Sequence, residues 1–139
     1  MAKAQHLRIN SDVSNLAAVA DFITTAAQQS GLNERDIYDV QMAVDEAVTN
    51  SIQHAYHGRT NGHIEIRCER RADDLIVEIV DGGKPFDASK VPTPRTRGPL
   101  SRRSIGGLGV FFMKKLMDEV EFTNLAEGGN RVRMVKHIR

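Results

Sequence analysis

The sequence predicts an α+β fold, a two-layer sandwich in which helices pack outside a sheet of paired strands. Two stretches with helical periodicity occupy the first part of the chain, at 16–27 and 33–56. Alternating stretches then come in neighbouring pairs, within 62–80 and 120–138. Paired strands with helices outside them are typical of this class, whereas a parallel sheet would alternate strand and helix. With 139 residues, the chain is expected to form a single domain, 1–139, with a core that needs no disulfide.

The first predicted elements are a short strand and a helix. Residues 5–10 alternate weakly between polar and apolar side chains, as a strand does. Ser11 is expected to cap the next helix, because apolar side chains then recur at steps of three and four. Glycine commonly follows the last residue of a helix, so this helix should end at Gly31.

The second predicted helix is longer. Asn33 is expected to cap it, with Asp36 as the reciprocal partner three residues further on. The helix should run to about Tyr56 and end at Gly58. Its buried face is formed by small and apolar side chains at helical spacing: Ile37, Val40, Val44, Ala47, Val48, Ser51, Ile52 and Ala55.

Two polar residues lie beside that buried face. Glu46 and Asn50 are one turn apart, so their side chains point the same way. A carboxylate and a carboxamide held together there could place a base next to a metal ligand. Taken alone, the pair is more commonly a solvated couple on a surface helix, so its meaning depends on the rest of the chain.

The second half of the chain is predicted to hold two antiparallel hairpins. The first pairs strands at 62–70 and 75–80, and the second pairs 120–125 with 131–138. A glycine-containing turn at 127–130 joins the last two strands.

The segment 83–104 is expected to be a lid. It contains all four prolines of the chain. Its charged residues are lysines and arginines, apart from a single acid, Asp87. A long loop in a compact domain is usually either functional or disordered. The basic charge of this one indicates an anionic ligand or partner.

Glycines directly after the lid indicate a ligand site. Gly106, Gly107 and Gly109 open a helix that should run to Met117, where backbone N–H groups could approach a phosphate. A flexible entry into the helix would explain them equally well.

Asp81 ends a buried strand, where its carboxylate could accept a hydrogen bond from an exocyclic amine such as that of adenine. An ordinary Asp-Gly turn is the alternative.

Composition excludes several classes of protein and site. A formal net charge of +1 argues against a general nucleic-acid-binding surface. No apolar run has the length of a signal peptide or membrane span, so we expect a cytoplasmic protein. The single cysteine, Cys68, rules out an internal disulfide framework and is expected in the core. The P-loop pattern is absent. His54, His57 and His63 are expected at helix ends or turns, not as zinc ligands.

Taken in order, these motifs resemble those of the Bergerat-fold ATPases, the group of gyrase, Hsp90, the histidine kinases and MutL. Glu46 and Asn50 resemble the N box of that group. The stretch 81–87 resembles its first glycine box, and 106–109 its second. Any one of these motifs is a weak signal, but three in this order at these spacings are a strong one.

The resemblance narrows further to the RsbW-type anti-sigma factor serine kinases of bacteria, which 45–56 and 107–120 are similar to. It covers almost the whole chain. It implies a mixed, mostly antiparallel sheet with helices on one face, and ATP and Mg²⁺ bound between helix and lid. It also implies a homodimeric protein serine/threonine kinase that phosphorylates a STAS-domain antagonist and binds a sigma factor. A nucleotide-binding adaptor that regulates by protein contacts alone, without phosphate transfer, remains the alternative.

The resemblance also implies roles for single residues. Asn50 would ligate Mg²⁺, and Glu46 would be the general base that accepts the proton of the attacking hydroxyl. Asp81 would bind the adenine amino group, and Gly83 would give the base room. Two further sets would contact the phosphates: backbone groups of Gly106, Gly107, Leu108 and Gly109, and the lid residues Arg102, Arg103 and Ser104.

The chain departs from the wider group on a late strand. Many members of that group carry a threonine near the adenine, whereas the corresponding region here, 129–133, has none. The sequence does not identify the residue that replaces it. His54 is also part of the resemblance, and no physical role beyond packing or a helix-end hydrogen bond follows for it.

Overall fold

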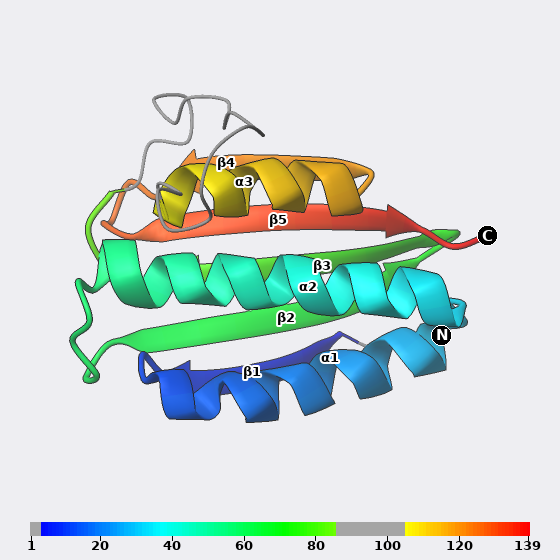
Figure 1. Ribbon diagram of the computed structural model, residues 1–139, viewed down its shortest axis with the longest axis horizontal. Helices are drawn as coiled ribbons and strands as arrows, with labels where there is room; N and C mark the ends of the chain where they lie inside the picture. Colours follow the sequence, from blue (N-terminus) through cyan, green and yellow to red (C-terminus); the bar gives the residue numbers. More distant parts are fainter. Residues whose placement is uncertain (1–3, 86–104) are drawn as a thin grey trace, which may run out of the picture.

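The computed structural model describes residues 4–85 and 105–139 of the chain, and in these a sheet forms one layer and helices the other (Figure 1). The strands are β1 (Gln5–Asn10), β2 (His63–Arg71), β3 (Asp74–Asp81), β4 (Glu119–Asn124) and β5 (Asn130–His137). Their order in the sheet is β1-β2-β3-β5-β4, and every neighbouring pair is antiparallel. The predicted two-layer α+β fold and both predicted hairpins are confirmed.

The helices cover a single face of the sheet (Figure 1). They are α1 (Leu16–Ser30), α2 (Glu34–Asn50) and α3 (Ile105–Leu116), with a short 3-10 turn η1 (Val13–Asn15) and a π-helical turn η2 (Ser51–Ala55). Helix α2 lies in the middle, over the centre of the sheet, and packs against α1 on one side and α3 on the other. Polar groups on α2 are therefore placed between two neighbouring helices.

The core lies between the two layers. It contains the inward side chains of α2, such as Val40, Val44 and Val48, against Ile79 of β3 and Met134 of β5, all at most 1% exposed. The period of two along the strands separates this face from the outer one, which carries charge pairs instead. For the described residues, none of the helices combines the length and hydrophobicity of a membrane-spanning segment.

The prediction that Ser11 caps the first helix is wrong. Asp12 accepts the backbone N–H of Ser14 at 2.9 Å and begins the turn η1 that leads into α1. Ser11 is buried, where its hydroxyl donates to the carbonyl of Arg59 and accepts the N–H of Gly62 at 3.0 Å. The hydroxyl that local spacing predicts as a helix cap is therefore bonded to residues distant in the sequence. The predicted end of this helix at Gly31, with φ +91°, is confirmed.

The capping box predicted for α2 is only half formed. The side chain of Asn33 accepts the N–H of Asp36 at 2.8 Å, as predicted. The reciprocal bond is absent in the described structure, because the Asp36 carboxylate lies 3.8 Å from the ammonium group of Lys136 and points into the protein. The carboxylate of Asp36 therefore pairs with the buried ammonium group of Lys136 and not with the beginning of the helix.

Candidate functional site

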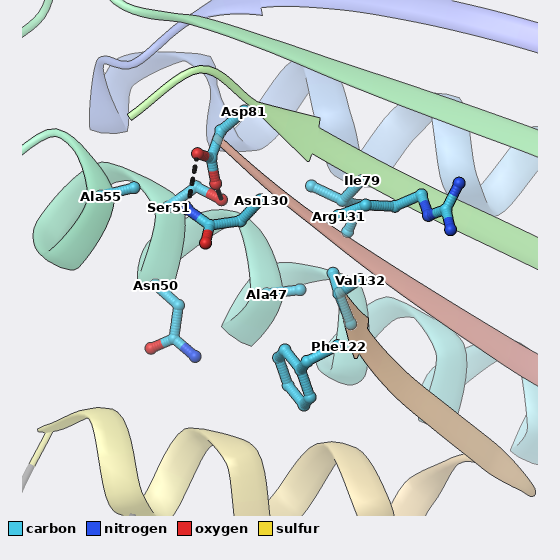
Figure 2. Close-up of a pocket in the computed structure, with 10 residues that line it drawn as sticks. All are labelled: Ala47, Asn50, Ser51, Ala55, Ile79, Asp81, Phe122, Asn130, Arg131 and Val132. Atoms are coloured by element: carbon cyan, nitrogen blue, oxygen red, sulfur yellow. Dashed lines mark hydrogen bonds between the residues drawn. The ribbon is translucent and has the colours of Figure 1, made fainter. Parts of the chain in front are cut away.

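A pocket opens where α2 ends, between that helix end and the neighbouring ends of β3 and β5 (Figure 2). Its walls are apolar and its far end is polar. The lining residues are Ala47, Asn50, Ser51, Ala55, Ile79, Asp81, Phe122, Asn130, Arg131 and Val132. The side chain of Arg131 points away from Asp81, so the polar end consists of neutral donors around one carboxylate.

The pocket depends on a change of helix type. Helix α2 continues beyond Asn50 as a π-helical turn, in which the N–H of Tyr56 donates to the carbonyl of Ser51 at 3.0 Å. Such turns are rare and occur frequently at functional sites. The wider turn leaves the carbonyl of Ala55 outside the helical ladder, where it accepts the N–H of Lys84 at 2.8 Å. The chain segment after β3 is thereby attached to the helix end.

Glu46 and Asn50 lie on the side of α2 that faces α3, and Figure 2 shows the Asn50 side chain pointing towards that helix. A Cβ atom at Gly109 of α3 would lie 2.9 Å from Oε2 of Glu46 and 3.5 Å from Oδ1 of Asn50. The glycine therefore lets the α3 backbone pass directly over the pair. Asn50 is 8% exposed, and for the described residues its Nδ2 has no hydrogen-bond partner. Two motifs separated in the sequence thus meet at one place.

The carboxylate of Asp81 is held at the opposite end of the pocket. Oδ2 accepts the hydroxyl of Ser51 at 2.9 Å, while Oδ1 accepts the N–H of Gly83 at 2.9 Å and Nδ2 of Asn130 at 3.0 Å. Asp81 is 5% exposed. Burial of a carboxylate is costly unless hydrogen bonds compensate it, and here donors from three segments do so.

The segment after Asp81 is packed closely on the helix end. A Cβ atom at Gly83 would lie 2.4 Å from the carbonyl oxygen of Ala55, so a side chain cannot be accommodated. The N–H of Gly82 donates to the hydroxyl of Tyr56 at 2.6 Å, and that hydroxyl donates to the carbonyl of His63 at 2.6 Å. Contact within the chain therefore explains the glycine at position 83, and a role in giving a base room stays a prediction.

The residues predicted to contact the phosphates lie partly in α3 and partly outside the described residues. Gly106, Gly107 and Leu108 belong to the first turns of α3, whereas the lid positions Arg102, Arg103 and Ser104 lie outside the described residues. Cys68 is buried in β2, and burial raises the pKa of its thiol to about 12, as suits the predicted core residue. Across the described ranges, no group of three histidine, cysteine or acidic side chains could hold a metal ion.

Sequence reasoning missed the two side chains that hold Asp81. The sequence pattern places Ser51 on the buried helix face and Asn130 in a turn. The available signal for Asn130 was strand pairing, since Asp81 and Asn130 are direct partners in the β3–β5 register. That register follows only once β5 is known to pair with β3 as well as with β4.

Residues 9–136 match the family described as the histidine kinase-like ATPase domain. Serine-protein kinase RsbW of Bacillus subtilis is 35% identical over 122 residues, which cover 84% of this chain and 74% of that protein. RsbW of Bacillus velezensis is 31% identical over 138 residues, covering 95% and 84% of the two chains. The chain therefore belongs to the histidine kinase-like ATPase domain family and, within it, to the RsbW-type serine-protein kinases.

Solved structures agree with the fold. The RsbU and RsbW domains of Rv1364c from Mycobacterium tuberculosis superpose with a TM-score of 0.70 at 16% identity, covering 98% of this chain and 32% of that one. The mycobacterial sensor histidine kinase MprB gives a TM-score of 0.56 at 13% identity, covering 97% and 99%. The resemblance inferred from the three sequence motifs is confirmed at the level of family and fold.

Proposed function

We propose that this chain is an ATP- and Mg²⁺-dependent protein serine kinase of a partner-switching system. It phosphorylates a STAS-domain antagonist and binds a sigma factor. The observation that carries the proposal is the meeting of Glu46 and Asn50 with Gly109 of α3, next to a pocket that ends in a buried carboxylate. Curated relatives named serine-protein kinase RsbW support the same activity.

In this proposal, the pocket takes the adenine base. Ile79, Phe122 and Val132 supply apolar surface for a flat ring, and Asp81 lies at the polar end. An ionised carboxylate only accepts hydrogen bonds, so it is matched to an exocyclic amine and mismatched to a carbonyl oxygen. Asp81 is therefore the residue that distinguishes the base.

Asn50 is the protein ligand of Mg²⁺ in this proposal. The fit rests on the amide oxygen of this buried side chain, because a hard, neutral oxygen is a suitable ligand for Mg²⁺. Mg²⁺ usually retains several waters and is held by one or two side chains together with substrate phosphates, so a cluster of acidic residues is not required. When bound, the ion supplies charge neutralisation to the phosphates.

The phosphates would lie at the beginning of α3. Backbone N–H groups of a helix's first turn have no partner within the helix and favour anions there. Counted from Ile105, these groups include those of Gly106, Gly107 and Leu108, whereas Gly109 is the fifth residue of α3, where an α-helical N–H donates to the carbonyl four residues earlier. We propose additional contacts from the lid residues Arg102, Arg103 and Ser104.

The chemical step assigned to Glu46 is proton removal. Its carboxylate accepts the hydroxyl proton of the partner's serine as the serine oxygen forms a bond to the γ-phosphorus. The bond between that phosphorus and the β,γ-bridging oxygen breaks, and ADP leaves with the bridging electrons. Phosphoryl transfer depends mainly on positioning and charge stabilisation, so a base one turn from the Mg²⁺ ligand is suitably placed.

The test is transfer of labelled phosphate from ATP to a purified STAS-domain antagonist. Glu46→Gln should abolish transfer and retain ATP binding, because the amide keeps the size but cannot accept the proton. Asp45→Asn is the matched control, since this neighbouring carboxylate is exposed to solvent and should leave transfer unchanged. Undiminished transfer by Glu46→Gln would contradict the base assignment. Nucleotide binding by the wild type without transfer to any antagonist would identify an adaptor instead.

The partners require a separate experiment. Affinity purification from a bacterial host should recover a sigma factor, and addition of unphosphorylated antagonist should release it. Because sigma factors act in the cytoplasm, the proposal places the protein there. We also propose that residues 1–139 form one domain and that the chain is a homodimer, which sedimentation equilibrium tests by a mass twice that of the 15.4 kDa chain.

A further inference from the structure

Asn130 holds together three parts of the pocket rim. Its Nδ2 donates to Oδ1 of Asp81 at 3.0 Å and to the carbonyl of Lys84 at 2.8 Å. Its Oδ1 accepts Nδ2 of Asn124 at 2.9 Å, at the end of β4. The carboxamide thus connects the end of β3, the segment after it and the end of β4. Figure 2 shows it next to Asp81 and on the same side of the pocket as Ser51.

The hydrogen-bonding capacity of Asn130 limits what it can do. A carboxamide nitrogen has two N–H donors, and both are used within the chain, on Asp81 and Lys84. The acceptor oxygen is oriented by Asn124, which fixes the nitrogen on the side of Asp81. Asn130 therefore has no N–H left to donate to a ligand without giving up one of these bonds, and as a donor it acts on a ligand through Asp81.

The same count identifies what remains on Asp81. A carboxylate offers about four acceptor positions, two on each oxygen. In the described structure Oδ1 accepts from Gly83 and Asn130, and Oδ2 accepts from Ser51. One acceptor position is left, on Oδ2. With Oδ1 fully used, the carboxylate is held against rotation and presents that single position to the pocket.

The backbone beside Asn130 reinforces this arrangement. A Cβ atom at Gly129 would lie 2.1 Å from the carbonyl oxygen of Asp81, so β5 begins in direct contact with the main chain of that residue. Lys84 is held from both sides, since its N–H donates to Ala55 and its carbonyl accepts from Asn130. Gly129 and Asn130 together fix both the main chain and the side chain of Asp81.

We infer that Asn130 is the positioning residue of the base subsite, and that it makes Asp81 select a purine with an amino group at C6 over a 6-oxopurine. The inference rests on the proposed nucleotide-binding function and adds the residue on which base selection depends. It also gives a role to one residue of the late-strand region 129–133, which contains no threonine.

The test compares the affinities of ATP and ITP, which differ at the C6 substituent of the base. The wild type should prefer ATP. Asn130→Ala should weaken ATP binding by about tenfold, as expected for loss of a hydrogen bond to a charged group, and change ITP binding by less than about twofold. The ratio of the two affinities then falls by about tenfold. Asn130→Asp should lower ATP affinity further, because a second carboxylate replaces the donor beside Asp81.

Three controls separate positioning from general damage. Asn15→Ala removes a carboxamide that donates to the carbonyl of Asn10, away from the pocket, and should alter neither affinity. Asn124→Ala leaves Asn130 in place but frees its orientation, so it should lower the ATP-to-ITP ratio by a smaller factor. Urea unfolding of each variant reports whether the fold is intact, and Asn124→Ala carries the test if Asn130→Ala unfolds.

The outcomes are distinct. An equal loss of ATP and ITP affinity in the variants would overturn the inference and show that Asn130 supports the pocket without selecting the base. An unchanged ratio in both Asn130→Ala and Asn124→Ala would overturn it as well. Wild-type protein that binds neither nucleotide would overturn the proposed function, and this inference with it.

Discussion

Substituting Gly109 by alanine should make the protein more stable and less active. An alanine Cβ would lie 2.9 Å from Oε2 of Glu46, whereas ordinary van der Waals contact begins at 3.4 Å, so this carboxylate must move by about 0.5 Å. The same Cβ would lie 3.5 and 3.6 Å from the carboxamide atoms of Asn50, which can stay in place. The perturbation therefore acts on the proposed base and spares the proposed metal ligand.

The two magnitudes have opposite signs. A misplacement of about 1 Å can cost about 100-fold in rate, so half that displacement should lower kcat by about tenfold, or about 1.4 kcal/mol. KM for ATP should hardly change. Alanine is favoured over glycine within a helix by about 0.5–1 kcal/mol, which corresponds to an increase in Tm of about 2–4 °C.

Steady-state phosphate transfer and thermal unfolding measure the two effects on the same preparation. Lys114→Ala is a suitable control, because this exposed residue lies on the same helix and should leave kcat unchanged. A Gly109→Ala protein with full kcat would refute the idea that close approach of α3 sets the position of Glu46. A parallel loss of stability and activity would show a backbone distortion instead.

Three further predictions concern the stability of the fold. Lys136 is 5% exposed, with its ammonium group 3.2 Å from Asp39 and 3.8 Å from Asp36; Lys136→Ala leaves these carboxylates uncompensated and should cost about 3–5 kcal/mol in urea unfolding, with a smaller loss for Asp39→Asn. Gly129→Ala should destabilise more than Gly128→Ala by the same assay, because both have positive φ (+101° and +98°) but only the first meets the Asp81 carbonyl, at 2.1 Å. The imidazole of His137 donates a 2.6 Å hydrogen bond to the carboxylate of Asp74, which raises the pKa of His137 above its ordinary 6.5; this stabilisation is fully present below pH 6.5 and is lost as the pH rises through the folded-state pKa. An NMR titration in which Asp74→Asn leaves the pKa of His137 unchanged would contradict that assignment.

What the sequence predicted well depends on local periodicity. The two helices, the paired strands and the end of α1 at Gly31 all follow from spacing and residue type within a few neighbouring turns. The same holds for Glu46 and Asn50, which share a helix and hence a direction. Local patterns were sufficient for these because each interaction joins residues that are close in the chain.

What the sequence did not predict depends on partners far along the chain. The hydroxyl of Ser11 donates to the carbonyl of Arg59, and the carboxylate of Asp36 pairs with Lys136. In both cases, a side chain that local rules predict as a helix cap interacts with a group distant in the sequence. The π-helical turn after Asn50 changes the hydrogen-bond register and leaves the apolar pattern almost unaltered. A pattern of buried positions cannot distinguish such a turn from a continued α-helix.

The two ends of the pocket differ in how completely the chain satisfies the hydrogen-bonding groups there. This difference predicts which part of the site rearranges when nucleotide binds. At the base end, donors from Ser51, Gly83 and Asn130 hold the carboxylate of Asp81 before any ligand arrives. At the other end, the carboxamide of Asn50 is buried with Nδ2 unpaired within the described structure. A pre-organised group binds without the cost of ordering, whereas an unsatisfied one gains most from a ligand that completes its contacts. Base recognition should therefore require little rearrangement, and the changes on nucleotide binding should concentrate around Asn50 and the beginning of α3.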